Sequence, residues 1–352
     1  MLLETAKYRR YKREAAVGLA ALGAALLAGG IGGALLQRGV EPMPAHSAAG
    51  VPHLPNIVAA SRGRGTRSPA EARRQPHSHT RATISLYEHT VRRLTLRHQG
   101  CGAAKRRVGG IVILDFGQPA YNGHTYGTYL FSGRFAGNEV ITRAMFAYAY
   151  GYHRCLARHS RLVITLARGT SNYHPQVPSA YRAGRKWARE TMALQHLLST
   201  HGLSEHVRSA AADDVEPAWD RSFHRTRDFF RGYRDARTGH TIYNFGSLDG
   251  GVGSVWNARQ VFFVTSGMRY AQAIPEIYNR AMARQWAQLA HIARHRYHRP
   301  LRFAGVMTTH TSANRGMKPR DAHRTLIRAL TASVGARAAD VPATLTNIRS
   351  AD

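Results

Sequence analysis

Two patterns of hydrophobic and polar residues alternate along the chain from residue 108 onward. Short runs of β-branched and other apolar residues are separated by longer stretches in which apolar residues recur every three or four positions. The short runs predict strands, and the longer stretches predict amphipathic helices. After Pro275, for example, Tyr278, Met282 and Trp286 fall on one helical face, and the proline occupies the favoured first turn.

Strand and helix patterns follow one another repeatedly, which predicts an α/β domain with a parallel sheet. The expected strands cover residues 111–116, 162–167, 207–213, 241–245, 261–265 and 303–309. The expected helices cover residues 138–155, 180–200, 221–236, 275–294 and 319–330. Such a chain forms either a doubly wound sheet or a (β/α) barrel. We favour a TIM-like barrel, possible also in a distorted or incomplete form, since only six strands are clear. Two further strands are expected near residues 125–131 and 249–259.

An uncharged apolar segment, residues 15–36, follows a basic N-terminus, residues 1–14. About 20 helical residues span a bilayer, so this segment is long enough to cross one. The basic flank should stay in the cytoplasm, which places everything after the segment outside. A buried core helix is a weaker interpretation, because the segment has no polar face. The segment is either a transmembrane signal anchor or a signal peptide. The nearest small-residue cleavage pattern, at 47–49, lies well beyond the apolar run and favours a single-pass anchor over a secreted product.

Residues 37–107 are rich in Arg, Pro, Gly, Ser and His and show little periodicity, which predicts a disordered linker. One patterned piece within it, ISLYEHTVRRLTLRH at residues 84–98, is compatible with a local helix. The folded domain is therefore expected over residues 108–332. Residues 333–352 are expected to form a C-terminal tail.

The charge balance is strongly basic, with 50 Lys and Arg against 20 Asp and Glu among 352 residues. Such a charge attracts polyanions, including nucleic acids, anionic lipids and anionic cell-wall polymers. It is equally compatible with an Arg-rich genome. Only five acidic residues precede residue 110, so the first third of the chain has an excess of positive charge. Such an asymmetry is typical of tails and linkers rather than of folded cores. The predicted export and the lack of a nucleic-acid-binding motif argue against nucleic acid as the partner.

The two cysteines, Cys101 and Cys155, are both expected at the N-terminal end of the sheet. Cys155 ends the first predicted helix of the domain, and Cys101 lies ten residues before the first predicted strand. Outside the cytoplasm such a pair can oxidise to a disulfide, which would stabilise the fold by about 4 kcal/mol. Two unrelated thiols are the alternative.

Candidate chemistry lies at the carboxyl ends of the predicted strands, where active sites of parallel α/β folds are built. Asp214 and Glu216 stand two residues apart, so in extended chain they point to the same side. Asp115 ends the first strand of the domain. Repulsion between nearby carboxylates makes their pKa values differ, so that one stays protonated as a general acid while another stays ionised, as in glycoside hydrolysis. The alternative is that the acidic residues close a turn or cap the next helix.

Further polar and aromatic residues follow the same strands and are expected to bind substrate: Gln118, Asn172, Tyr173, Trp219, Asn244, Asp249 and His310. Sugar rings stack on Tyr and Trp faces, although such residues are more often packing residues. The Gly-rich segment 246–254 lacks the Lys-Ser/Thr of a phosphate loop, and no His or Cys spacing is typical of a metal site. No cofactor and no metal are therefore expected.

Several segments together carry a family resemblance: LDFGQP, ARGTSNYHPQV, DDVEPAW, IYNFGSLDG, PEIYNRAMARQWAQL and FAGVMTTHT. The chain resembles, over residues 108–330, exported actinobacterial proteins with a glycoside-hydrolase-like (β/α) barrel, distantly similar to family-25 muramidases. The resemblance implies Glu216 as acid, with Asp214 and Asp115 stabilising charge or activating water. The expected function is an extracytoplasmic domain that acts on or binds cell-wall polysaccharide. A catalytically inactive wall- or polyanion-binding module is the alternative, so enzymatic activity is left open.

Overall fold

The computed structural model describes residues 82–312, 314–336 and 340–351. The predicted cytoplasmic tail, the predicted membrane segment and the linker up to residue 81 lie outside the described residues. Among the helices that the structure does describe, none combines the length and apolarity needed to cross a bilayer.

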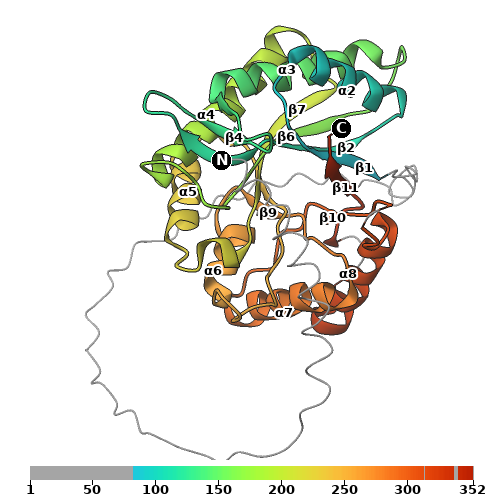
Figure 1. Cartoon of the computed structure of the whole chain (residues 1–352). Helices are drawn as coiled ribbons and strands as arrows, with labels where there is room; N and C mark the ends of the chain where they lie inside the picture. Colours follow the sequence, from blue (N-terminus) through green and yellow to red (C-terminus); the bar gives the residue numbers. More distant parts are fainter. Residues whose placement is uncertain (1–81, 313, 337–339, 352) are drawn as a thin grey trace, which may run out of the picture. The chain divides into compact units, whose positions relative to one another are not determined.

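A parallel sheet is the centre of the described domain. Its eight strands are β1 (Thr83–Tyr87), β2 (Gly110–Asp115), β6 (Ile164–Ser171), β7 (Val207–Asp214), β8 (Ile242–Asn244), β9 (Ala271–Ala273), β10 (Val306–Thr308) and β11 (Leu345–Ser350). In the spatial order β10-β11-β1-β2-β6-β7-β8-β9, strands that follow one another in this sheet lie side by side, except β9 and β10, and the last strand, β11, pairs with the first, β1. The sheet is curled, and helices surround it (Figure 1).

Backbone contacts also connect β9 and β10, the two ends of this order. Ala273 and Phe303 form a parallel bridge, and Glu276 and Met307 form another. The amide of Ala304 donates to the carbonyl of Ala273 at 2.8 Å. Isolated bridges therefore link the chain around β9 with the chain around β10.

The helices pack on the outer face of the sheet (Figure 1). They are α2 (Arg93–Lys105), α3 (Asn138–Cys155), α4 (Ala180–Thr200), α5 (His224–Asp235), α6 (Ala258–Phe262), α7 (Arg280–Arg296) and α8 (Pro319–Val334), with short turns η2 (Pro217–Asp220) and η3 (Phe263–Gly267). The boundaries predicted for α3 and α4 agree with the structure, and those of α5, α7 and α8 differ by a few residues. Local patterning was sufficient because each of these helices buries one apolar stripe.

Side chains from alternate strand positions fill the inside of the curl. This inner core includes Ile113, Ala167, Ala212, Tyr243 and Ile274, all buried. The intervening strand residues pack outward against the helices. The concave side of the sheet is therefore a packed core below the carboxyl ends of the strands.

A small antiparallel sheet interrupts the strand–helix alternation after β2. It consists of β3 (Gly117–Tyr121), β4 (Tyr126–Leu130) and β5 (Phe135–Gly137). The strand expected near residues 125–131 exists as β4, but its assignment to the parallel sheet is wrong. The short connections from β3 to β4 and from β4 to β5 allow only antiparallel hairpins, because a parallel crossover needs a dozen or more residues.

The strand predicted at residues 261–265 is wrong, since this segment is helical in α6 and η3. Asn257 and Gln260 form a capping box that starts a helix immediately before the β-branched run. The strand that follows β8 in the parallel sheet is instead β9, which comes after this helical segment in the chain. The strand expected near 249–259 is also wrong, because those residues form turns and the start of α6.

The linker prediction is wrong for β1 and α2, although the local helix expected within residues 84–98 is present from Arg93 onward, and the tail prediction is wrong for β11. β1 lies between β11 and β2, with Thr83 opposite Thr346. Buried polar side chains of β1 and β11 form a hydrogen bond with each other, with the hydroxyl oxygens of Ser85 and Thr346 2.7 Å apart. The most buried positions of β1 are polar, Thr83 and Ser85, and those of β11 mix Thr346 with Leu345 and Ile348. The apolar positions therefore did not mark the core face of either strand.

The predicted disulfide is present between Cys101 in α2 and Cys155 in α3. The two helices pack with their backbones in close approach. A Cβ atom on Gly100 would lie 2.0 Å from the carbonyl oxygen of Tyr148, and one on Gly151 would lie 2.0 Å from that of Arg97. The glycines bring the helices close enough for the sulfur atoms to bond.

Candidate functional site

The three predicted catalytic carboxylates lie at the carboxyl ends of two strands that flank β6. Asp115 is the last residue of β2, Asp214 is the last residue of β7, and Glu216 follows two residues later. Both strands pair with β6, where Asp115 stands opposite Gly169 and Asp214 stands opposite Ser171. Two strand spacings, about 10 Å, therefore separate the two backbones across the sheet.

Asp115 and Asp214 project to the inside of the curled sheet. Ile113 and Ala212 belong to the inner core, and residues two positions apart in a strand share a face. Both aspartates are 0% exposed. Gly169 lies opposite Asp115 in β6, and only a residue without a side chain fits there, because a Cβ atom would lie 2.7 Å from the Cα of Asp115. The curvature turns both side chains toward the same central region.

Hydrogen bonds orient the Asp115 carboxylate. Its Oδ1 accepts from the amide of Gly117 at 2.9 Å, and the hydroxyl of Thr170 donates to the Gly117 carbonyl at 2.8 Å. Gly117 has a φ of 117°, and a Cβ atom there would lie 2.3 Å from the carbonyl oxygen of Tyr129. Only glycine suits this turn, so the local backbone and the Asp115 side chain are held as one unit.

The Glu216 backbone is held by Asn172, a residue predicted to bind substrate. The Asn172 Oδ1 accepts from the amide of Glu216 at 3.0 Å, and its Nδ2 donates to the Glu216 carbonyl at 3.1 Å. Asn172 is buried, whereas Glu216 is half-buried. The structure therefore places Asn172 as a support for the Glu216 backbone.

A third aspartate, Asp213, lies beside the pair and faces the helix layer near Thr226 and Phe229. Burial raises its pKa well above the ordinary range, and the negative charges of Asp214 and Asp115 raise it further. Ionising every carboxyl in this cluster at once is electrostatically unfavourable. The arrangement therefore favours the protonated form of Asp213.

Aromatic rings flank the acidic cluster. Tyr173 and Trp219 meet edge to face with ring centroids 5.4 Å apart, and Trp219 is 8% exposed. Asp249 supports the turn that carries Trp219, since its Oδ2 accepts from the amide of Ala218 at 2.7 Å. Tyr173 and Trp219 are thus in contact with each other, while Asp249 contacts backbone.

The remaining predicted residues are distributed around the same end of the sheet. Asn244 is buried, and its Oδ1 accepts from the amide of Gly246 at 3.1 Å. Gln118 is half-buried on β3. His310 follows β10, with its Nδ1 2.6 Å from the carbonyl oxygen of Gly316. Gln118, Asn244 and His310 lie on or just after three different strands, and the described hydrogen bonds do not join them into one cluster.

Sequence reasoning missed two buried carboxylates at this end of the sheet, Glu276 and Glu88. Glu276 is 1% exposed and follows the inner-core residue Ile274 by two positions, so alternation directs it inward. Glu88 is 0% exposed and comes directly after β1. Both were missed because their strands, β9 and β1, were assigned elsewhere. A glutamate after the apolar pair Ala273-Ile274 was the available signal for Glu276.

No group of three or more His, Cys, Asp or Glu side chains in the described part of the chain is arranged to hold a metal ion. Comparison with known proteins adds no assignment, since no protein-family model, curated protein or solved structure matches the chain. The chemical interpretation therefore depends on the residues and their geometry.

Proposed function

We propose that the sheet closes into a (β/α)₈ barrel and that the domain is glycoside-hydrolase-like, acting outside the cytoplasm on cell-wall polysaccharide. The barrel is supported by sequential parallel pairing of the strands and by the bridges between the β9 and β10 ends. Export is supported by the basic and apolar N-terminal sequence. The Cys101–Cys155 disulfide agrees with an oxidising location.

One observation carries the catalytic proposal: Asp115 and Asp214 end nearby parallel strands on the same inner face, with Glu216 two residues beyond. Glu216 is the most exposed of the three and is the proposed general acid, protonating the glycosidic oxygen. Asp214 and Asp115 stabilise the developing oxocarbenium charge or activate water. The raised pKa of Asp213 supports a cluster in which protonated and ionised carboxyls coexist.

The sugar-binding part of the proposal assigns Tyr173 and Trp219 to a subsite wall. Their edge-to-face contact holds two aromatic surfaces beside the Glu216 turn. Asn172 and Asp249 act on the backbone of this turn and so position the acid. Gln118, Asn244 and His310 complete the polar surroundings at the neighbouring strand ends.

The test is Glu216→Gln, with Glu205→Gln as the matched control. Glu205 is an exposed glutamate just before β7, at the opposite end of the strand. We expect Glu216→Gln to lower sugar release from purified peptidoglycan by at least about 100-fold, the lower range for loss of a general acid. The melting temperature should be nearly unchanged for both variants, and Glu205→Gln should cleave like the unmodified protein.

The second candidate is a catalytically inactive module that binds wall polysaccharide or another polyanion. It is favoured by the complete burial of Asp115 and Asp214 and by the large excess of Arg. Under this function the unmodified protein releases no sugar from any wall preparation but sediments with the wall, and Glu216→Gln changes neither result.

A further inference from the structure

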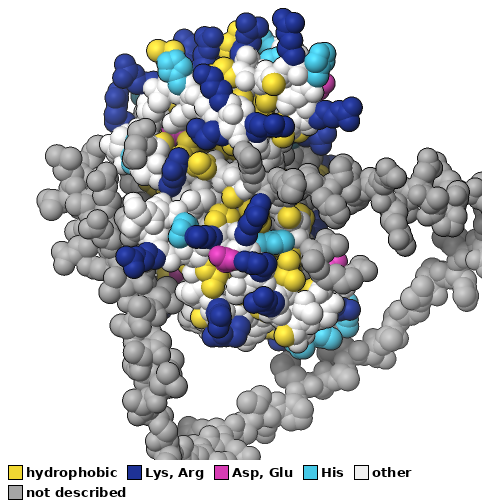
Figure 2. Space-filling view, turned by 90° about the vertical axis from the view of Figure 1, so that its right-hand side faces the viewer, with side chains coloured by type: hydrophobic (Ala, Val, Ile, Leu, Met, Phe, Trp, Pro, Cys, Tyr) yellow, Lys and Arg dark blue, Asp and Glu magenta, His cyan; other side chains and the backbone are white. Residues whose placement is uncertain are grey.

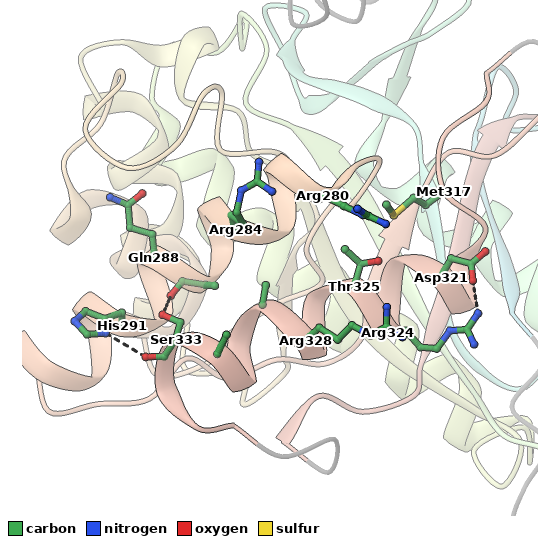
Figure 3. Close-up of a pocket in the computed structure, with 13 residues that line it drawn as sticks. Arg280, Arg284, Gln288, His291, Met317, Asp321, Arg324, Thr325, Arg328 and Ser333 are labelled. Carbon is green, nitrogen blue, oxygen red and sulfur yellow. Dashed lines mark hydrogen bonds and ion pairs between the residues drawn. The ribbon is translucent and has the colours of Figure 1, made fainter. Parts of the chain in front are cut away.

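α7 and α8 run side by side in the same direction with a groove between them (Figure 3). Near their beginnings the amide of Met317 donates to the carbonyl of Tyr278 at 3.2 Å. Near their ends the Nδ1 of His291 lies 3.3 Å from the carbonyl oxygen of Ser333. The groove has a volume of about 1030 Å³. It begins on the same side as the carboxylates, because both helices start after the carboxyl ends of their strands.

Arginine dominates the described lining of this groove. Arg280 and Arg284 come from α7, and Arg324 and Arg328 come from α8. All four are exposed. Asp321 is the single acidic residue in the described lining, and it is already paired with Arg324 at 2.5 Å. Within the described part of the chain, Arg280, Arg284 and Arg328 make no ion pair, so their charges are available to a ligand.

The side chains that line the groove between these arginines are mostly small or polar. They include Ala287, Gln288, Thr325 and Ala329. Proteins that hold single-stranded nucleic acids stack bases on aromatic side chains, whereas the described lining contains no Phe, Tyr or Trp and a single imidazole, that of His291, whose Nδ1 lies 3.3 Å from the carbonyl oxygen of Ser333. Membrane-surface helices insert large apolar side chains, which the described lining also lacks apart from Met317. A narrow, flexible polyanion without bases or acyl chains fits this surface best.

The spacing of the arginines matches a polymer with regularly placed phosphates. Arg280 and Arg284, like Arg324 and Arg328, are four residues apart, which is about 6 Å along a helix. Three backbone bonds of an extended chain span about 3.5 Å, so a repeat of six bonds spans about 7 Å. A polyol phosphodiester has six backbone bonds per repeat when the polyol contributes three carbons. Guanidinium groups bind phosphate oxygens in bidentate fashion.

We propose that the α7–α8 groove binds a linear polyol-phosphate polymer, through Arg280, Arg284 and Arg328. Figure 2 shows basic side chains spread widely over one face of the molecule, with few acidic ones among them. The groove differs from this general surface in being concave and in aligning its arginines on two helices. The site would tether the domain to a phosphate-bearing wall polymer, and it operates whether or not the carboxylates cleave sugar.

The experiment measures binding of the full-length chain, in detergent micelles, to a glycerol-phosphate oligomer of defined length. The groove variant is Arg280→Gln/Arg284→Gln/Arg328→Gln. The control variant is Arg154→Gln/Arg158→Gln/Arg161→Gln, which removes the same charge from three exposed arginines at the other end of the strands. Glutamine keeps helix propensity, and a thermal melt verifies folding of both variants.

We expect the groove variant to bind at least 10-fold more weakly at about 0.1 M salt, and the control variant to change less than 3-fold. The slope of log affinity against log salt should fall by about 2 in the groove variant, at about 0.7 per lost phosphate contact. Equal losses in both variants would mean general charge attraction and overturn the proposal. The groove could also bind a polyuronate, or a single-stranded DNA of equal charge, as tightly as the glycerol-phosphate oligomer. That result would overturn the assignment of a polyol-phosphate ligand. Glu216→Gln should bind normally, which separates this result from the catalytic proposal.

Discussion

Replacing Glu88 by glutamine should stabilise the protein at neutral and alkaline pH. Glu88 is fully buried between β1 and the helix layer, where the Nε2 of Gln99 donates to its Oε2 at 3.4 Å. Within the described residues its Oε1 has no hydrogen-bond partner. Burial therefore raises the pKa of Glu88 from 4.5 to about 7, with the Gln99 hydrogen bond opposing the shift weakly.

The sign of the effect follows from the direction of this shift. The folded state binds the Glu88 proton more tightly than the unfolded state, so the free energy of unfolding falls as pH rises from 4.5 to about 7. Each pKa unit corresponds to about 1.4 kcal/mol, so the total loss is about 3 kcal/mol above pH 7. A glutamine side chain at this position does not ionise and should remove this loss. Its neutral amide retains a hydrogen-bonding partner in Gln99.

Urea unfolding at pH 5, 6, 7 and 8 measures the effect for the unmodified protein and for Glu88→Gln. The two should be similar in stability at pH 5, and the variant should be more stable by about 3 kcal/mol at pH 8. Glu139→Gln, which changes an exposed glutamate at the start of α3, is the control and should leave the pH profile unchanged. A parallel pH profile for the unmodified protein and Glu88→Gln would refute the reasoning, because Glu88 would then titrate normally.

Two further predictions concern the disulfide and the N-terminal boundary of the domain. Replacing Cys101 and Cys155 together by Ser should lower the free energy of unfolding by about 4 kcal/mol, as estimated for closing a loop of 54 residues, and denaturant unfolding under oxidising conditions measures this. A reduced protein as stable as the oxidised one would contradict it. A chain that begins at residue 82 should melt cooperatively, whereas one that begins at residue 107 should not, because it lacks the strand that joins β11 to β2. Differential scanning calorimetry distinguishes them, and cooperative melting of the shorter chain would show that β1 is dispensable.

The helices were predictable because their signals are local. Ser179 accepts from the amide of Arg182 at the start of α4, and an apolar stripe from Ala183 to Leu198 is buried along it. These signals need only neighbouring residues, so a single sequence contains them. The long strands β2, β6 and β7 were recognisable for the same reason, since each is an extended buried run.

The candidate site was predictable where it followed those strands. Asp115 lies near the end of a recognisable run, and Asp214 and Glu216 follow another. The rule that parallel strands present their carboxyl ends together placed these residues in one region. The role of Asn172 as a backbone support was not predictable, because its bonds to Glu216 join residues 44 positions apart. Glu276 was missed because β9 is only three residues long and reads Ala-Gln-Ala.

By itself the sequence determined the α/β class, the main helices and the acidic strand ends, because these depend on periodicity and on residue types within one segment. Only the tertiary structure decided that β1 and β11 complete the sheet, since Thr83–Tyr87 pairs with a strand about 260 residues later. It also decided that the run after Asn257 is helical and that four arginines of α7 and α8 share one groove within the described residues. The physical reason is that extended backbone in short strands, and charge clusters on separate helices, are defined by partners distant in the chain.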